Sequence, residues 1–342
     1  MSSSAAAEVQ HTDVVVIGAG PVGLFAVFEC GMLGLRCRVI DALDAVGGQL
    51  TALYPEKPIY DIPGYPRIEA GELVRQLERQ AAPFHPTYHL NQRVERLQRL
   101  GDGRWRIETE RGIAIDAWCV IIAGGAGAFG PNRPPLPNIA AYEGTSVLYS
   151  IARRDGLAGK RVVIAGGGDS AVDWALSLAD IARVAVVHRR DKFRAAPDSE
   201  RKLRALAGSG KVELVVPFQL AGLEGPAPQL SGVVVESLDG ERRVLPADML
   251  LAFYGLATSL GPIAAWGLNL NRQQIDVDPT TAATNLPGVF AVGDMAHYTG
   301  KLKLILTGFA EAAQAAHAAY AIARPGKALH FEYSTTKGVP QD

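Results

Sequence analysis

Two stretches of the chain decide its fold. Residues 13–23 read DVVVIGAGPVG, and residues 161–171 read RVVIAGGGDSA. In each, a short continuous apolar run leads into closely spaced glycines, which is typical of a strand buried on both faces that turns sharply into a helix. A second apolar run follows each stretch, at residues 37–40 and 184–187. The sequence therefore predicts two strand–helix–strand units, with Gly18 and Gly166 in equivalent turns 148 residues apart.

The size and composition of the chain fit this pattern. Its 342 residues suggest two domains, and an apolar content of 48% is enough for two cores. We therefore expect the α/β fold class, with two Rossmann-type domains that are doubly wound and three-layered. The net charge of −1 indicates no general attraction to nucleic acid or membrane. The first residues lack a signal-peptide pattern, and no apolar run reaches the length of about 20 residues that spans a membrane.

The cysteines and histidines indicate the compartment and exclude some chemistry. Three cysteines, Cys30, Cys37 and Cys119, are too few and too scattered for a disulfide framework, which favours a reducing, cytoplasmic location. No Cys-x-x-Cys occurs, and the seven histidines do not cluster at metal-ligand spacing. We expect no metal site and no redox-active cysteine pair.

The first glycine cluster predicts a site for FAD. Gly18 would allow the tight turn, Gly20 the close approach of a pyrophosphate, and Gly23 the packing of helix on sheet. The helix that follows would turn its free N–H groups and positive dipole end toward the phosphates. Asp41, 23 residues after Gly18, ends the next strand, where a carboxylate can accept hydrogen bonds from a ribose. The alternatives are an ordinary glycine turn and, for Asp41, a solvated strand end.

The second glycine cluster predicts a site for NADPH. Counting 23 residues past Gly166 reaches Arg189, so a basic residue stands where the first unit has its carboxylate. Arginine suits a ribose 2′-phosphate, which it can bind through paired N–H donors. The alternative is a solvated basic turn. The residues expected to bind NADPH are Gly166, Gly168, Asp169, Ser170, Arg189, Arg190 and Arg194.

A third segment returns the chain to the first site. Residues 284–294, TNLPGVFAVGD, predict a strand that ends at Asp294, whose carboxylate could hold the ribityl hydroxyls of the flavin. A helix from about Gly308 could direct its positive end at the flavin ring system. We therefore expect a discontinuous FAD-binding domain, residues 1–124 and 286–342, with an NADPH-binding domain, residues 125–285, inserted in it.

The order of the three motifs resembles the low-molecular-weight thioredoxin reductases across essentially the whole chain. Those proteins carry a Cys-x-x-Cys that is missing here. Without it, the chain is more similar to the thioredoxin-reductase-like ferredoxin/flavodoxin–NADP reductases. Three segments carry this resemblance: residues 47–50 (GGQL), 54–57 (YPEK) and the tail at 333–335 (YST).

This resemblance implies further site residues. Val94 would act through its backbone near the adenine, and Asp41 stands where relatives often have glutamate, one methylene longer. We expect Tyr54 on one face of the flavin and Tyr333, from the C-terminal tail, on the other. The residues implied to contact FAD are Asp41, Gln49, Tyr54, Val94, Phe129, Asp294 and Thr335.

The resemblance also implies a reaction and partners. FAD would take a hydride from NADPH at its N5 and release electrons singly to ferredoxin or flavodoxin, with no side chain acting as a catalyst. Homodimers are typical of the family. Lys301 and Lys303 could form a basic surface for an acidic partner, or be ordinary solvated lysines. Two alternatives stay open: a reductase of a small acceptor (quinone, oxygen or a dithiol), and a non-catalytic NADPH or redox sensor.

Overall fold

The computed structural model describes residues 9–151, 153–329 and 338–340. They fall into two compact units, one within residues 1–129 and 258–342 and the other within residues 130–257. Residues 258–285 thus lie with the first unit, although the sequence assigned them to the second domain. Leu260, Ile263 and Ile275 pack in the core of the first unit, which is why this segment stays with it.

The first unit is built on a parallel sheet with an antiparallel branch. β1 is central, with β2 and β8 on either side, and Ile17 is in register with both Ile40 and Ile122. Strand β8 also pairs antiparallel with β7, which continues to β6. The parallel order is β5 (Thr87–His89), β2 (Cys37–Ile40), β1 (Gln10–Ile17), β8 (Ala114–Ile122) and β21 (Val289–Ala291), and the branch is β7 (Trp105–Thr109) and β6 (Val94–Arg99).

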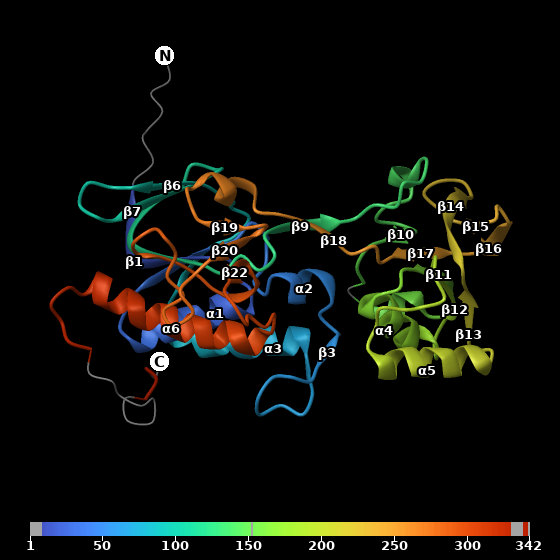
Figure 1. Ribbon diagram of the computed structural model, residues 1–342, viewed down its shortest axis with the longest axis horizontal. Coiled ribbons are helices and arrows are strands. Elements are labelled where there is room, and N and C mark those ends of the chain that lie inside the picture. Colours follow the sequence, from blue (N-terminus) through green and yellow to red (C-terminus); the bar gives the residue numbers. More distant parts are fainter. Residues whose placement is uncertain (1–8, 152, 330–337, 341–342) are drawn as a thin grey trace, which may run out of the picture. The chain divides into compact units, whose positions relative to one another are not determined.

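Both faces of this sheet are covered, so the strands are apolar on both sides. Val14 and Val16 of β1 face one core and Val15 and Ile17 face another. On one face, α1 packs against both α3 and α6 (Figure 1). The branch β6–β7 and the segment around Ile263 contribute to the core on the other face. The three helices are α1 (Pro21–Met32), α3 (Ala70–Ala81) and α6 (Ile305–Ala323).

The second unit repeats this plan. Its sheet is parallel, with β11 central and Ala165 in register with Val187 and Ala252. Helices α4 (Asp169–Leu178) and α5 (Pro197–Gly208) pack on one face, and a three-stranded antiparallel sheet packs on the other. The order is β13 (Val212–Val215), β12 (Arg183–Val187), β11 (Arg161–Ala165), β17 (Met249–Ala252) and β10 (Val147–Leu148), and the antiparallel sheet is β14 (Phe218–Glu224), β15 (Gly232–Ser237) and β16 (Arg242–Pro246).

The remaining elements are short. They are α2 (Gln49–Leu53), β3 (Pro58–Ile59), β4 (Ile68–Glu69), β9 (Ala128–Pro131), β18 (Leu256–Ser259), β19 (Leu270–Asn271), β20 (Gln274–Asp276), β22 (Ala296–His297) and the 3-10 turns η1 (Ala82–Phe84), η2 (Ile139–Ala141), η3 (Arg154–Leu157), η4 (Gly261–Ala265) and η5 (Gly293–Met295). Within the described residues, no helix has the length and apolar character needed to cross a bilayer.

The expected fold class is confirmed, and most elements lie where the sequence predicted them. The strands expected at residues 37–40 and 161–165 are β2 and β11. Helix α6 begins at Ile305, three residues before the position expected from Gly308. The difference is small because apolar residues precede Gly308 and continue the helix.

Candidate nucleotide-binding sites

The first glycine turn has room for a side chain at one of its three glycines and none at the other two. Gly18 has φ +109°, and a Cβ there would lie 2.4 Å from the carbonyl oxygen of Ala123. A Cβ on Gly23 would lie 1.9 Å from the carbonyl oxygen of Gly18. A Cβ on Gly20 would meet nothing within 4 Å. Backbone therefore packs tightly around Gly18 and Gly23, whereas the space beside Gly20 is open.

Asp41 braces this turn. Its Oδ2 accepts a hydrogen bond from the N–H of Ala19 at 2.6 Å, and its Oδ1 accepts one from Leu43 at 2.8 Å. Burial raises the pKa of the Asp41 carboxyl, and the two backbone hydrogen bonds oppose that shift. A carboxylate offers about four acceptor positions, so two remain for the hydroxyls of a ribose.

The segment that follows β2 lies directly on the turn. The N–H of Gly47 donates to the carbonyl of Ala19 at 2.8 Å, and a Cβ on Gly48 would lie 3.2 Å from the Cα of Gly20. The amide of Gln49 lies 3.8 Å from the position of a Cβ on Gly125. Gln49 therefore stands beside two glycine-rich turns, at the ends of β1 and β8.

Tyr54 and Asp294 complete this group. Tyr54 follows α2 and is half-buried, and burial together with the Asp294 carboxylate raises the pKa of its phenol. Asp294 is exposed on η5, immediately after β21. A Cβ on Gly124 would lie 2.9 Å from the methyl carbon of Met295, so the end of β8 meets the same turn. The predicted residues from three distant segments thus converge in the first unit.

The remaining predicted FAD contacts are placed less fully. Val94 is buried at the start of β6, and the N–H of Gln92 just before it donates to the carbonyl of Asp41 at 2.9 Å. The chain entering β6 thus runs past Asp41. Phe129 lies on β9. Tyr333 and Thr335 lie outside the described residues, and their contacts stay predictions.

The second glycine turn has the same form with one change. A Cβ on Gly166 would lie 2.7 Å from the carbonyl oxygen of Phe253, and one on Gly168 would meet nothing within 4 Å. Ala171 takes the third position, and its Cβ lies 3.0 Å from the place of a Cβ on Gly166. The turn is thus closed at Gly166 and open at Gly168, which suits a second pyrophosphate.

The basic loop, residues 188–194, is hydrogen-bonded to this turn. The N–H of Arg194 donates to the carbonyl of Gly167 at 2.7 Å, and the Asp169 carboxylate accepts the N–H of Ala196 at 2.9 Å. Asp169 therefore joins the loop to the start of α4, and Ser170 beside it is exposed. Arg189, Arg190 and Arg194 are exposed too.

The structure corrects one step of the sequence argument. Asp41 N–H donates to the carbonyl of His89 on the neighbouring strand, and in the second unit the equivalent bond runs from His188 to Val215. The position equivalent to Asp41 is therefore His188, and Arg189 lies one residue further on. Counting the same number of residues in both units pairs Asp41 with Arg189 instead of His188, because the second unit has one residue fewer between its first glycine and the end of its second strand.

His188 is a residue that the spacing argument did not find. A Cβ on Gly167 would lie 2.3 Å from its ring, so the imidazole packs directly on the glycine turn. The ring also stacks near Phe193, with centroids 5.4 Å apart. Burial lowers the pKa of His188, and Arg189 and Arg194 lower it further.

Lys301 is not part of a basic surface. Its side chain is 5% exposed and its ammonium pairs with the carboxylate of Glu311, which is 3% exposed. Lys303 is exposed. The sequence carries one indication of this pair, because Glu311 is the one carboxylate in the alanine-rich helix α6.

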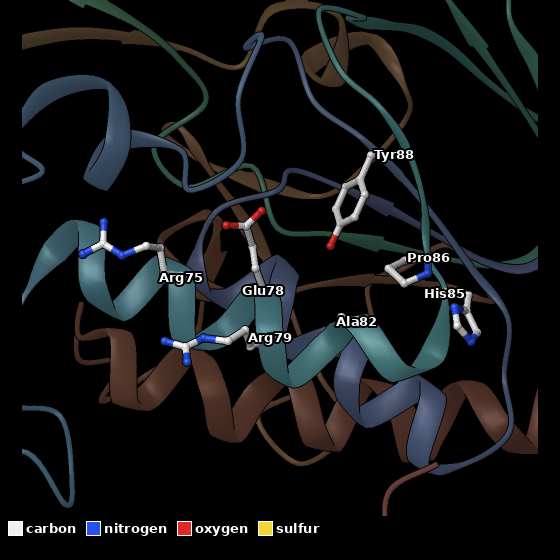
Figure 2. Close-up of a pocket in the computed structure, with 7 residues that line it drawn as sticks. All are labelled: Arg75, Glu78, Arg79, Ala82, His85, Pro86 and Tyr88. Carbon is white, nitrogen blue, oxygen red and sulfur yellow. The ribbon is translucent and has the colours of Figure 1, made fainter. Parts of the chain in front are cut away.

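A separate shallow pocket lies on the face of α3. It has a volume of about 610 Å³, and Figure 2 shows Glu78 of α3 and Tyr88 of β5 pointing toward the same space. Burial and the neighbouring Glu78 raise the pKa of Tyr88 to about 12. None of the predicted ligands lines this pocket, which is bounded by Arg75, Glu78, Arg79, Ala82, His85, Pro86 and Tyr88.

Comparison with known proteins identifies the family. Residues 12–321 match the family model of the pyridine nucleotide-disulphide oxidoreductases. The chain belongs to this family. The chain is 62% identical over 334 residues to a ferredoxin–NADP reductase of Paramagnetospirillum magneticum, covering 97% of this chain and 99% of the relative. It is also 62% identical to one of Rhodospirillum rubrum, covering 96% of this chain and 97% of the relative.

Solved structures of similar proteins agree on the fold. A thioredoxin reductase of Lactococcus lactis matches with a TM-score of 0.76 at 25% identity, covering 91% of this chain and 99% of that one. The thioredoxin reductase of T. acidophilum has the same TM-score at 24% identity, covering 91% and 98%. The expected resemblance to thioredoxin-reductase-like ferredoxin–NADP reductases is confirmed.

Proposed function

We propose that the protein is a ferredoxin–NADP reductase that uses FAD to pass electrons between NADPH and ferredoxin. The observation that carries this function is the 62% identity, over almost the whole length of both chains, to ferredoxin–NADP reductases. The two glycine turns account for the two nucleotides that this reaction needs. Bound FAD supplies the conversion between two-electron and one-electron transfer, which no amino-acid side chain can perform.

The residues of the first unit fit FAD. The open space at Gly20 and the start of α1 would receive the pyrophosphate, with Asp41 on the ribose and the Val94 backbone near the adenine. Gln49, Tyr54 and Asp294 would hold the flavin half, with Tyr54 against one face of the ring. Phe129, Tyr333 and Thr335 are further contacts that rest on the family resemblance alone.

The second unit would bind NADPH. Gly166 and Gly168 shape the turn for its pyrophosphate, and the hydroxyl of Ser170 can donate to a phosphate oxygen. The exposed guanidinium groups of Arg189, Arg190 and Arg194 would bind the 2′-phosphate. Asp169 acts mainly through the backbone of Ala196, so it would position the loop that carries Arg194.

The cysteines further support ferredoxin, rather than a dithiol, as the electron acceptor. Cys30, Cys37 and Cys119 are free and buried. A hydrogen bond with Cys37, together with burial, raises the pKa of Cys30, and burial raises that of Cys119, so neither is a ready thiolate donor to a dithiol acceptor. Their reduced state is also consistent with a cytoplasmic location. By resemblance we further propose that flavodoxin can replace ferredoxin and that the enzyme is a homodimer.

A steady-state assay of the FAD-loaded protein with NADPH tests the function. Turnover should be highest with purified ferredoxin or flavodoxin and much lower with a quinone or oxygen. Faster turnover with a quinone or oxygen would favour a reductase of small acceptors. Tight FAD binding without turnover on any acceptor would favour a redox sensor.

A further inference from the structure

A buried carboxylate lies behind the turn that carries Asp294. Glu311 of α6 is almost fully buried, and its Oε2 accepts a hydrogen bond from the N–H of Gly293 at 2.8 Å. Its Oε1 accepts one from the Tyr298 hydroxyl at 2.7 Å and also contacts the Lys301 ammonium. Both carboxylate oxygens thus have partners, and burial with the hydrogen bond to Glu311 raises the pKa of Tyr298 to about 12.

Helix α6 touches this turn at two successive positions on one face. A Cβ on Gly308 would lie 3.2 Å from the Cα of Gly293 and 2.4 Å from the side chain of Val22, which lies between Gly20 and Gly23. One helical turn further, Glu311 binds the amide of Gly293. Gly293 itself has φ +71°, so its backbone takes a left-handed shape that other residues rarely adopt. The helix therefore determines where Asp294, the next residue, is presented.

Packing alone does not call for charged groups here. The buried positions of α6 around Glu311 include Ala312, Ala315 and Ala316, and an apolar side chain would fill the place without desolvating two charges. The carboxylate provides an acceptor for the Gly293 amide. Lys301 provides the opposite charge that offsets the cost of burying the carboxylate.

We propose that Glu311, neutralised by Lys301, is a positioning residue for the flavin site: its hydrogen bond to Gly293 sets the turn that presents Asp294 to the cofactor. This rests on the proposed FAD site but not on the identity of the acceptor. It assigns to the pair a role in affinity for the flavin and in the environment of the flavin, beyond any role in holding α6 to the sheet.

Two double variants test the hydrogen-bond acceptor at position 311 separately from the charges. Glu311→Met with Lys301→Met removes both charges and keeps the side-chain length, whereas Glu311→Gln with Lys301→Met keeps an amide oxygen that can accept from Gly293. The second unit provides a control with the same kinds of partner but greater exposure: Glu143 accepts from Tyr149 at 2.6 Å and pairs with Arg133 at 2.9 Å. The control variant is Glu143→Met with Arg133→Met.

The measurements are the dissociation constant of FAD from the apoprotein, by flavin fluorescence, and the visible circular dichroism of the bound flavin. Loss of the acceptor should weaken FAD binding by about 10-fold or more in the Met double variant and alter the flavin dichroism. The Gln double variant should lie within about threefold of wild type, since the hydrogen bond to the amide is retained. The control should bind FAD as wild type does.

Thermal unfolding of each apoprotein separates positioning from folding. A folded Met double variant with wild-type FAD affinity and dichroism would overturn the proposal. Equal losses of FAD affinity in the Gln and Met double variants would overturn it too. If the Met protein does not fold, the Gln protein is compared with wild type, and a loss of FAD affinity beyond about threefold overturns the proposal. Wild-type protein that fails to bind FAD would instead contradict the proposed function.

Discussion

The two units have the same strand order but opposite chemistry at the strand end. In the first, the parallel order outward from β1 is β2 and β5 on one side and β8 and β21 on the other; in the second, β11 is flanked by β12 and β13, and by β17 and β10. The outermost strands on one side come from different places in the sequence. Strand β21 is the last strand of its sheet along the chain, whereas β10 is the first strand of its sheet. One architecture therefore tolerates different connections.

The residue after the second strand contacts the glycine turn in both units. Asp41 does so by a hydrogen bond to the Ala19 amide, and His188 by packing its ring on Gly167. In the first unit one carboxylate braces the turn and can still bind a ribose. In the second, His188 supports the turn, and we propose that Arg189 and its neighbours bind the 2′-phosphate.

The largest difference should appear at the third position of each turn. Gly23→Ala places a Cβ against the carbonyl of Gly18, so we expect a loss of about 3 kcal/mol or more in stability and loss of bound FAD. The converse change, Ala171→Gly, should cost only about 1 kcal/mol, the difference in helix propensity. Thermal unfolding and FAD content measure both. Similar losses in the two variants would show that the turns do not differ in packing.

Removing the brace from the first turn should be the next largest effect. Asp41→Ala loses charge-assisted hydrogen bonds, so FAD should bind about 10–100-fold more weakly, with the Michaelis constant for NADPH little changed. Fluorescence titration of the apoprotein with FAD gives the first quantity and steady-state kinetics the second. The exposed neighbour Asp44 provides the control as Asp44→Ala. An Asp41→Ala protein with wild-type FAD affinity would remove Asp41 from the site.

Neutralising the basic strand end should affect one nucleotide only. In Arg189→Gln with Arg190→Gln, the Michaelis constant for NADPH should rise about 10–100-fold, because charge-assisted bonds to the 2′-phosphate are lost. The constant for NADH, which lacks that phosphate, should not change. Lys192→Gln, on the same loop, is the control. An unchanged preference for NADPH over NADH would contradict the assignment of the second unit.

The smallest effect concerns the pH dependence of the second unit. Because burial lowers the pKa of His188 below its ordinary value of 6.5, the unfolded chain takes up a proton first as the pH falls. The stabilising contribution of neutral His188 is therefore present above pH 6.5 and is lost as the pH falls through its folded-state pKa. Thermal unfolding across this range should show a shallower loss of stability in His188→Gln than in wild type. Parallel curves would indicate that the ring is not shielded.

Local patterns explain why much of this could be predicted from the sequence. Strand, glycine turn and helix follow one another within about a dozen residues, so Gly18, Gly20, Gly23, Gly166 and Gly168 were placed without long-range information. Asp41 was found because the length of one helix and its loops roughly sets the distance to the strand end. The same count failed by one residue at His188, since small differences in connection length are not visible in a spacing rule.

The sequence by itself determined that this chain has two nucleotide-binding units, one with an acidic and one with a basic strand end. Only the tertiary structure decided which residues meet across long separations. Gln49 reaches the end of β8, Tyr54 lies near Asp294, and Lys301 turns inward to Glu311. These contacts depend on strand register and on how α6 packs against the turns, so a surface lysine and a buried one look the same in the sequence. Burial, which only the folded chain establishes, pairs Lys301 with Glu311 and rules out both interpretations that the sequence left open for it, a partner contact and a solvated lysine.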